Sequence, residues 1–382
     1  MNVANNKDCY GCGICAIACP LHIITMHHNE DGFYEPKVDL NKCINCGLCT
    51  SVCSFNDTRL YDIGSNKILS YASWSKNEEN RSKSSSGGVV YSIARQLIDD
   101  GYKICAVKYN VDKRRAEHFI ASSPEELEAS IGSKYIQSYT LDGLTSINGS
   151  EKYVIIGTPC MIDSVRRLIN IKRQEERFLL IDFFCHGVPS SILWNKYVDV
   201  QEASIGPIKE VSWRHSDKGW HDSLKMHLVA DEIYNGGLSQ NDIFYQLFLG
   251  DYCLGKACYK KCKFKMQNTS ADIRVGDLWG KTYSKYKDGV SGVLLITEKG
   301  KEIFLSIQDL FSKEESIDVV MEGQMHKSPS CPLVRSYLLK IMKWGGSNFK
   351  KERFIIKIDT MLKKIVKLLF NPCVVIRNRF IK

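Results

Sequence analysis

Short apolar runs alternate with segments of helical hydrophobic spacing through the middle of the chain. The apolar runs predict strands at Ile68–Trp74, Lys103–Tyr109, Glu117–Ser122, Tyr153–Ile156 and Phe178–Phe184. Apolar residues at helical spacing predict helices at Val89–Asp100 and Met161–Asn170, and from Ser190 through Tyr197. Strands that alternate with helices are typical of an α/β domain with a largely parallel sheet.

Two of the predicted strands run directly into turns that contain a cysteine. Tyr153–Ile156 is followed by Gly157-Thr-Pro-Cys160, and Phe178–Phe184 is followed by Cys185. Because the carboxyl ends of parallel strands meet at the edge where α/β sheets bind ligands, we expect both cysteines at that edge. The helix that begins after Cys160 favours the thiolate form of this residue.

The first 53 residues follow a different pattern, since they hold eight of the sixteen cysteines. The spacing C-x2-C-x2-C-x3-C occurs twice, at Cys9, Cys12, Cys15 and Cys19 and at Cys43, Cys46, Cys49 and Cys53. This is the spacing of two-cluster bacterial ferredoxins, in which the fourth cysteine of each run binds the other cluster, whereas zinc sites use cysteine pairs. The expected ligand sets are Cys9, Cys12, Cys15 and Cys53 for one [4Fe–4S] cluster, and Cys43, Cys46, Cys49 and Cys19 for the second. Two adjacent clusters make an electron conduit and not, by themselves, an enzyme.

Further cysteines lie where they could bind metal. Cys258 and Cys262 form a C-x3-C pair among lysines, which favour ionised thiols. With Cys160 and Cys185 this pair could form a third site of four thiolates, and Cys253 is the reserve ligand if Cys185 is not used. Three other cysteines are interpreted as small buried hydrophobic residues, namely Cys105, Cys331 and Cys373.

The composition is that of an ordinary globular protein, with 44% hydrophobic and 25% charged residues, and it excludes disorder and a coiled coil. No apolar run approaches the ~18 residues that a membrane-spanning helix needs. The start of the chain lacks the basic and apolar regions of a signal peptide, so we predict a cytoplasmic protein. In that compartment many cysteines indicate metal or redox chemistry and not disulfides.

The net charge of +9 is confined to residues 343–382, where eleven Lys and Arg face only Glu352 and Asp359. Since residues 1–342 are neutral, the charge gives no indication of nucleic-acid binding. A helix is predicted in this tail, with an apolar face of Phe354, Ile358, Met361, Leu362, Ile365, Leu368 and Leu369. Its basic face holds Arg353, Lys357, Lys363, Lys364 and Lys367.

Two interpretations of this amphipathic tail stay open. Residues 350–382 could make peripheral contact with anionic lipid at the inner face of the membrane. Alternatively, the helix packs its apolar face on the body of the protein, as any surface helix does.

Two polar–aromatic segments, Trp213–His221 and Ala271–Gly280, combine flat apolar groups with hydrogen-bonding side chains. They would suit a flavin ring, and they suit a structural role equally well. His186, His215 and His221 are candidate proton donors only because of their place in or beside such segments.

A serine–glycine run, Ser84–Gly88, precedes the predicted helix at Val89. It can cap this helix or offer backbone N–H groups to a phosphate. The polar segment Gly132–Ser138 contains an isolated Lys134, which could meet a phosphate or lie in water.

Taken together, these segments resemble the coenzyme F420 hydrogenase/dehydrogenase beta-subunit family, many members of which carry a ferredoxin-like front end. The resemblance covers about residues 68–300, with the motifs in the family's order. The matching stretches are Ser84–Gly88, Gly132–Ser138, Gly157-Thr-Pro-Cys160, Cys185-His-Gly-Val-Pro-Ser190, Cys258-Tyr-Lys-Lys-Cys262 and Asp272-Ile-Arg-Val-Gly-Asp-Leu-Trp-Gly280.

The resemblance implies an FAD-binding iron–sulfur flavoprotein. It implies that Cys160, Cys185, Cys258 and Cys262 hold a third [4Fe–4S] cluster near the flavin. The residues that it implies for FAD are Ser85, Ser86, Gly87, Gly88, Gly132, Ser133, Lys134, Tyr135, Gln137, Ser138, Thr158 and His186. It assigns no catalytic side chain.

The sequence therefore predicts an α+β ferredoxin-like module over residues 1–60, a larger α/β oxidoreductase domain over 61–342 and a basic amphipathic tail over 343–382. The expected function is electron transfer between [4Fe–4S] clusters and FAD, with a ferredoxin-like partner and a small organic substrate. By resemblance, surface-polysaccharide metabolism is one setting. One alternative is an oxidoreductase of the deazaflavin coenzyme F420. Another, of a different class, is a non-catalytic electron-transfer subunit of a larger complex.

Overall fold

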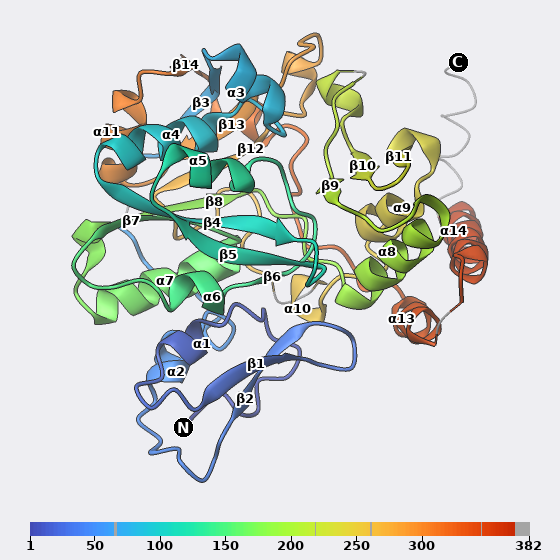
Figure 1. Ribbon diagram of the computed structural model, residues 1–382, viewed down its shortest axis with the longest axis horizontal. Helices are drawn as coiled ribbons and strands as arrows, with labels where there is room; N and C mark the ends of the chain where they lie inside the picture. The colour runs from blue at the N-terminus through green and yellow to red at the C-terminus, as the bar shows by residue number, and fades with distance from the viewer. Residues whose placement is uncertain (65–66, 218, 260–261, 345, 371–382) are drawn as a thin grey trace.

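The computed structural model describes the chain except residues 65–66, 218, 260–261, 345 and 371–382. Figure 1 shows a small module from the first part of the chain at the bottom and a central sheet with helices on both faces above it. A helical region that ends in α14 (Lys350–Phe370) lies to the right. The central sheet and its covering helices confirm the predicted α/β class.

The N-terminal module consists of two short helices and one hairpin: α1 (Ile14–Ile17), β1 (Ile24–His28), β2 (Tyr34–Val38) and α2 (Leu48–Ser51). The two strands pair antiparallel. Gly13 and Gly47 precede the helices with φ of 75° and 82°, a left-handed conformation that glycine adopts without strain. Since these glycines directly follow Cys12 and Cys46, the two halves of the module turn in the same way. The predicted α+β arrangement is confirmed.

Within the described residues, nine strands form the central sheet, in the order β14–β3–β13–β12–β8–β7–β4–β5–β6. Their bounds are β3 (Leu69–Ser75), β4 (Tyr102–Asn110), β5 (Arg115–Ala121), β6 (Ser138–Tyr139), β7 (Lys152–Ile156), β8 (Phe178–Phe183), β12 (Ile273–Asp277), β13 (Ser291–Leu295) and β14 (Leu310–Glu314). The four central strands β12, β8, β7 and β4 are parallel to one another. Antiparallel pairing begins on either side of them, with β13 and with β5.

Side chains of β7 and β8 alternate between two covered faces of the sheet. Val154 and Leu179 pack on the side of α4 (Val89–Asp99), α5 (Pro124–Leu127) and α11 (Glu298–Ser306). Ile155 and Leu180 pack on the side of α6 (Leu141–Leu144) and α7 (Pro159–Ile171). Continuous apolar strands are expected where both faces are buried, which explains why these runs could be found in the sequence.

A second core lies among α8 (Ser191–Ile205), α9 (Ile243–Leu249), α13 (Arg335–Lys343) and a three-stranded antiparallel sheet. The strands of this sheet are β9 (Glu210–Ser212), β10 (Lys225–Val229) and β11 (Ile233–Gly237). Helix α8 continues to Ile205, so the predicted end at Tyr197 is wrong. The continuation buries polar Gln201 as well as Val198 and Ile205, and this mixed burial leaves no clear hydrophobic period in the sequence.

The remaining elements are short. They are α3 (Glu78–Lys83), α10 (Lys256–Tyr259), α12 (Ile317–Met321) and the 3-10 turns η1 (Glu128–Ser130), η2 (Glu175–Arg177), η3 (Trp220–Asp222), η4 (Leu238–Gln240) and η5 (Lys281–Tyr283). Among the helices in the described part of the chain, none has the length and apolar character needed to cross a bilayer.

The N-terminal module docks on the face of the sheet that α6 and α7 cover. The side chain of Ser164, in α7, accepts a hydrogen bond from Ser54 N at 3.1 Å. The side chain of Thr140, at the start of α6, donates to Cys12 O at 2.8 Å. These contacts hold the first cysteine run against the sheet.

Candidate functional site

A cavity of about 530 Å³ lies at the carboxyl edge of β7, β8 and β12. Segments that follow or end these strands line it: Gly157–Cys160 after β7, Phe184–Val188 after β8, and Gly276–Asp277 at the end of β12. This is the edge at which the strand–helix alternation predicts a ligand.

Cys160, Cys185, Cys258 and Cys262 all line this cavity. Burial raises the pKa of Cys185 to about 11 and that of Cys258 to about 12. The ammonium of Lys265 opposes the rise at Cys185, to whose carbonyl oxygen it donates a hydrogen bond of 2.7 Å. Metal binding at these thiols would therefore release protons. Four converging cysteines are the donor set of a [4Fe–4S] cluster, so the residues present fit this group.

The eight cysteines of the N-terminal module form two groups. In the first group, the thiol of Cys9 is close enough to interact electrostatically with the thiols of Cys12 and Cys53. The thiol of Cys15 interacts in the same way with each of these three thiols. In the second, four cysteines line another, much smaller cavity: Cys19, Cys43, Cys46 and Cys49. The structure thus brings together the two sets that the ferredoxin spacing predicts, with the fourth cysteine of each run joining the other set.

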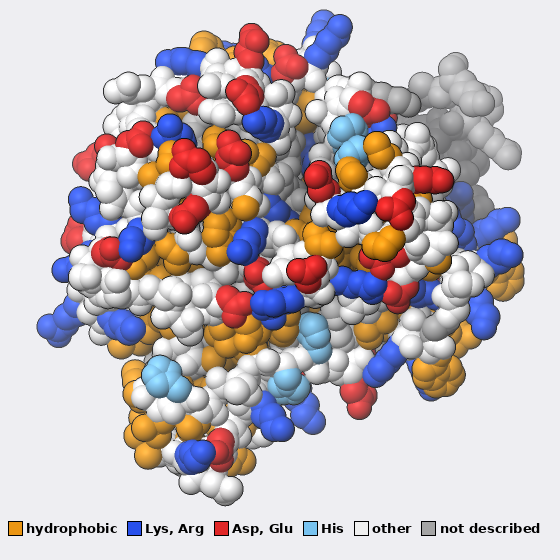
Figure 2. All heavy atoms as spheres, in the orientation of Figure 1, with side chains coloured by type: hydrophobic (Ala, Val, Ile, Leu, Met, Phe, Trp, Pro, Cys, Tyr) orange, Lys and Arg blue, Asp and Glu red, His pale blue; other side chains and the backbone are white. Residues whose placement is uncertain are grey.

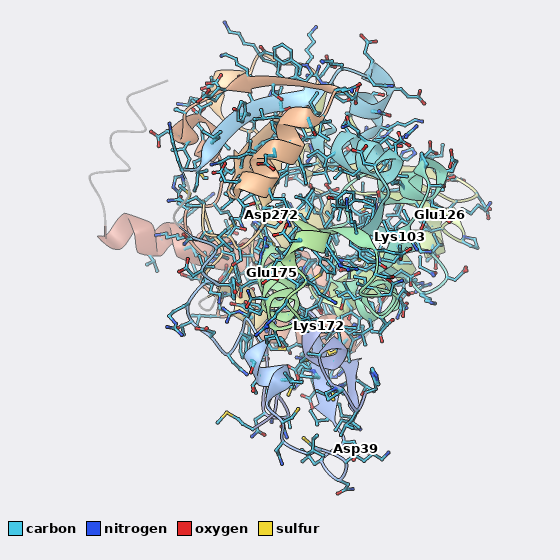
Figure 3. All side chains as sticks on the ribbon, turned by 90° about the vertical axis from the view of Figure 1, so that its left-hand side faces the viewer. Asp39, Lys103, Glu126, Lys172, Glu175 and Asp272 are labelled. Atoms are coloured by element: carbon cyan, nitrogen blue, oxygen red, sulfur yellow. The ribbon has the colours of Figure 1, made fainter. Side chains whose placement is uncertain are left out.

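Exposure varies within both groups. Cys15 of the first group and Cys19 and Cys49 of the second are buried, whereas Cys46 of the second is exposed. Asp39, in the turn that leads to Cys43, marks the end of the module farthest from the sheet in Figure 3. The first group faces the central sheet, and the second faces outward.

Within the described residues, no group of three or more His, Cys, Asp or Glu side chains is arranged to bind a single metal ion. The thiols of a cluster site stand farther apart than those around one ion, because each binds a different iron at a corner of the cube.

Tyr10 and Cys12 connect the N-terminal module to the cavity, because both residues line it. The Cys160 thiol is within electrostatic reach of Cys12. The ring of Tyr10 packs edge-on against Phe264, with ring centroids 6.0 Å apart. Its phenol lies near Cys160, Cys258 and Cys262, which together with burial raise its pKa. The first N-terminal group and the third group of cysteines are thus neighbours.

The two polar loops that the resemblance assigns to FAD meet at the cavity. Ser133 N donates to Ser85 Oγ at 2.7 Å, which joins the two loops directly. Of the twelve residues predicted for FAD, all line the cavity except Gly87. A Cβ atom at Gly87 would lie 2.5 Å from Ser73 O and 2.9 Å from Ser291 N, so this glycine serves close backbone packing.

Lys134 lies at the cavity, and its ammonium is hydrogen-bonded to backbone carbonyl oxygens. Its Nζ atom donates to the carbonyl oxygens of Ser130 at 2.7 Å, Ile131 at 2.9 Å and Gly132 at 3.0 Å. Burial lowers the pKa of Lys134 to about 7. The side chain thus holds the end of the η1 turn and the loop after it.

Gln137 and Ser138 are engaged by protein groups as well. Gln137 Oε1 accepts from Tyr34 N at 3.0 Å, and its Nε2 donates to Tyr10 O at 3.2 Å, so its amide ties the N-terminal module to the sheet. Ser138 Oγ lies 3.1 Å from His118 Nδ1. His118 is a cavity residue that the sequence analysis missed, and burial lowers its pKa to about 4, so it is neutral at physiological pH.

Three other residues predicted to bind the cofactor each contact a polar group of the protein. Thr158 Oγ1 lies 3.4 Å from Cys160 Sγ, within reach of a weak hydrogen bond. His186 Nε2 lies 3.0 Å from Asp251 Oδ1. The phenol of Tyr135 accepts a hydrogen bond of 3.3 Å from Arg214 Nη1.

Some residues of the two polar–aromatic segments connect strands of the sheet, and others line the cavity. Arg274 is fully buried and makes two hydrogen bonds of 2.7 Å to the carboxylate of Asp182. Asp272, which lies in the middle of the body in Figure 3, accepts 2.8 Å hydrogen bonds from Arg166 and Thr297. These residues join β12 to its neighbours and do not reach the cavity.

Asp277 and Trp279 do line the cavity. Asp277 accepts from Arg214 Nη1 at 3.0 Å and from Trp220 Nε1 at 2.9 Å. The rings of Trp220 and Trp279 stack with centroids 5.1 Å apart. His221 packs beside these tryptophans and His215 stacks on His227 at 4.4 Å, and neither is among the residues that line the cavity.

Aromatic side chains from distant parts of the chain complete the cavity wall, and the sequence analysis missed them. They are Phe183, Phe184, Phe248 and Phe264. Phe183 and Phe184 stand next to Cys185, so their position at the end of a predicted strand was a usable signal. Phe248 comes from α9, and nothing in its local sequence indicates that it reaches this edge.

The cysteines outside the three groups differ in burial and in position. Cys253 is fully buried in the core around α8 and α9, away from the cavity, so it is not placed to act as the reserve ligand. Cys105 is buried, as predicted, but Cys331 is exposed, and its prediction as a buried residue is wrong. Cys373 lies outside the described residues.

Comparison with known proteins agrees with this arrangement. Residues 8–56 match the profile of a 4Fe-4S dicluster domain. Residues 70–144 and 150–316 match the N-terminal and C-terminal parts of the coenzyme F420 hydrogenase/dehydrogenase beta subunit. The chain belongs to this family of iron–sulfur oxidoreductases and carries a dicluster module at its front.

Two known proteins illustrate the relationship. The coenzyme F420-dependent sulfite reductase of Methanocaldococcus jannaschii is 28% identical over 313 residues, which cover 79% of this chain and 46% of that protein. The chain thus spans about half the length of this relative. A chain of the F420-reducing [NiFe] hydrogenase complex from Methanosarcina barkeri is 17% identical with a TM-score of 0.46, and the match covers 75% of this chain and 92% of that one.

Proposed function

We propose that this protein exchanges electrons between coenzyme F420 and a series of iron–sulfur clusters. The observation that carries the proposal is that one cavity is shared by the four thiols of Cys160, Cys185, Cys258 and Cys262, the loops Ser84–Gly88 and Gly132–Ser138, and Cys12 of the dicluster module. The name of the sulfite reductase supports F420 as the organic partner. The comparisons give no support to surface-polysaccharide metabolism.

In this proposal the residues of the cavity have separate tasks. The four cysteines would hold a third [4Fe–4S] cluster, and Cys12 with its group would hold the next one outward. Phe184, Phe264 and Trp279 offer apolar surface for a flat ring, and the hydroxyl of Ser86 lies at the same cavity. The second group, of which Cys46 is exposed, would exchange electrons with a ferredoxin-like partner.

F420 supplies two electrons together as a hydride, whereas a cluster carries one, so a group that divides the pair is needed and FAD has this ability. We therefore propose FAD in the same cavity. The support for FAD is this chemical need together with the family resemblance, and the names of the relatives mention F420 alone.

The test is an anaerobic titration of the purified chain. Reduced F420 is expected to bleach the iron–sulfur absorbance, and the flavin extracted from the protein is expected to be FAD at about one per chain. The matched control is NADH, which should leave the spectrum unchanged. Bleaching by a reduced ferredoxin but not by reduced F420 would refute the deazaflavin proposal, and bleaching by F420 without extractable flavin would refute FAD alone.

A second candidate is an electron-transfer subunit with no turnover of its own. It is favoured by the dicluster module at residues 8–56, since two adjacent clusters make an electron conduit and not, by themselves, an enzyme. This candidate predicts that clusters and cofactor reduce normally while no organic or inorganic acceptor turns over until a partner protein is added.

A further inference from the structure

Helix α14 packs on the body with its acidic side chains inward. Glu352 is 1% exposed and Asp359 is 9% exposed, although they are the only acidic residues of the basic tail. Glu352 Oε1 accepts from the buried Lys196 Nζ at 2.6 Å. Asp359 Oδ2 accepts from Tyr252 OH at 2.7 Å. Both carboxylates thus point toward the body, and Asp359 also pairs with Lys363 of the same helix at 2.7 Å.

The opposite side of α14 exposes apolar side chains. We call this side the tail surface; it consists of Phe354, Ile358, Met361, Leu362 and Ile365, each between 37% and 64% exposed. A helix whose only task is to cover the body would turn this side inward. The interpretation that the apolar face packs on the body is therefore wrong, since only Ile355 and Ile356 are half-buried against the core.

Aromatic and basic residues are also exposed on and near α13 and α14. Trp344 is 75% exposed and Tyr337 is 59% exposed on or beside α13, which packs next to α14. Exposed lysines on α14 include Lys357 and Lys364. Figure 2 shows hydrophobic and basic side chains together along the right-hand margin, where α13 and α14 lie in Figure 1. In the described part of the tail, every side chain that reaches the surface is apolar, basic or uncharged.

We propose that the tail surface docks this protein on an anionic phospholipid bilayer, with α14 lying in the interface. Positive charge beside an apolar strip complements acidic headgroups, and the long lysine stems let the ammonium groups reach the headgroups while the strip enters the acyl region. Lysine is depleted in the buried centre of protein–protein interfaces, so the same composition fits a protein partner less well.

This inference is independent of the proposed redox chemistry. The N-terminal module lies at the bottom of the molecule in Figure 1, away from α14 at the right. Cys46 of the second cysteine group, which is exposed, therefore stays open to a soluble electron-carrying protein while α14 binds lipid.

The test is flotation of the full chain, purified with its clusters, on vesicles of phosphatidylglycerol and phosphatidylcholine or of phosphatidylcholine alone. Binding is expected only with phosphatidylglycerol, and it is expected to weaken at high salt. The double variant Lys357→Gln/Lys364→Gln should lower the partition coefficient roughly 30-fold, since each basic residue contributes on the order of 1 kcal/mol. Leu362→Asn should also lower it.

Two variants on other surfaces serve as matched controls. Leu305 is 61% exposed on α11, and Leu305→Asn should bind vesicles like the wild type. Lys172, which is exposed after α7 and labelled in Figure 3, provides Lys172→Gln as the charge control. Absence of flotation on anionic vesicles overturns the proposal. So does a concentration-dependent dimer in sedimentation that Leu362→Asn abolishes, because the tail surface would then be covered by a second copy of the chain.

Discussion

Gly87 and Gly132 show how two glycines in similar polar loops acquire different roles. Both belong to segments that resemble cofactor loops, and local sequence does not distinguish them. Gly87 faces the backbone of β3 and β13, where a Cβ would lie 2.5 Å from Ser73 O. Gly132 has φ of 84° and no atom within 4 Å of a Cβ position. The first glycine is required by packing, and the second only by its backbone conformation.

The substitution Gly87→Ala is therefore expected to lower the free energy of unfolding by about 2–3 kcal/mol, because backbone atoms on both sides of the added methyl group must move. Gly132→Ala should cost only about 1 kcal/mol, the strain of a left-handed alanine. Urea denaturation of the two variants beside wild type measures the difference. Equal stability of Gly87→Ala and wild type would contradict the packing role.

At the scale of elements, α14 shows that an amphipathic pattern does not say which face a helix buries. The sequence predicts an apolar face and a basic face, and neither face as a whole packs on the body. The residues that pack on the body include Glu352, Ile356 and Asp359, because Lys196 and Tyr252 bind the two carboxylates. Long-range partners, which a helical wheel cannot include, decided the orientation.

The buried pair predicts a specific response to mutation. Glu352→Ala should destabilise the protein by about 3–5 kcal/mol, because it leaves the buried Lys196 ammonium without its carboxylate. The double variant Lys196→Met/Glu352→Leu should lose much less, since no charge then stays buried. Glu79→Ala is the matched control: it removes an exposed pair with Lys83 and should cost far less stability than Glu352→Ala. A double variant as unstable as Glu352→Ala would contradict this account, with urea midpoints as the measurement.

At the scale of the whole molecule, the three cysteine groups lie in series. The group with the exposed Cys46 lies on the outer side of the N-terminal module, the group with Cys12 faces the sheet, and the group with Cys160 lies in the cavity. Docking of the module by Gln137 and Thr140 keeps the second and third members of this series adjacent. The order follows from how the module sits on the sheet.

This series predicts the result of removing one proposed ligand. Cys160→Ala should lower the iron content by about four per chain, the content of one [4Fe–4S] cluster. It should also stop reduction of the N-terminal clusters by reduced F420 while dithionite still reduces them. Cys331→Ala, at an exposed cysteine outside the groups, should keep the wild-type iron content. Unchanged iron in Cys160→Ala would remove the third cluster from the proposed route.

The sequence by itself determined the features that depend on neighbouring residues. The repeated cysteine spacing defined the ferredoxin-like module, and the runs at β7 and β8 defined a parallel core with Cys160 and Cys185 at its carboxyl edge. Both are local patterns, because a thiolate loop and a buried strand are encoded within a few residues.

Tertiary structure alone decided the rest. It brought Phe248 of α9 and His118 of β5 to the cavity, turned the Lys134 ammonium toward carbonyl oxygens, and placed Cys253 in a hydrophobic core. It also buried the carboxylates of α14 and left its apolar side exposed. In each case the outcome depends on groups far apart in the chain, whose approach is set by the packing of whole elements and not by the pattern within any one of them.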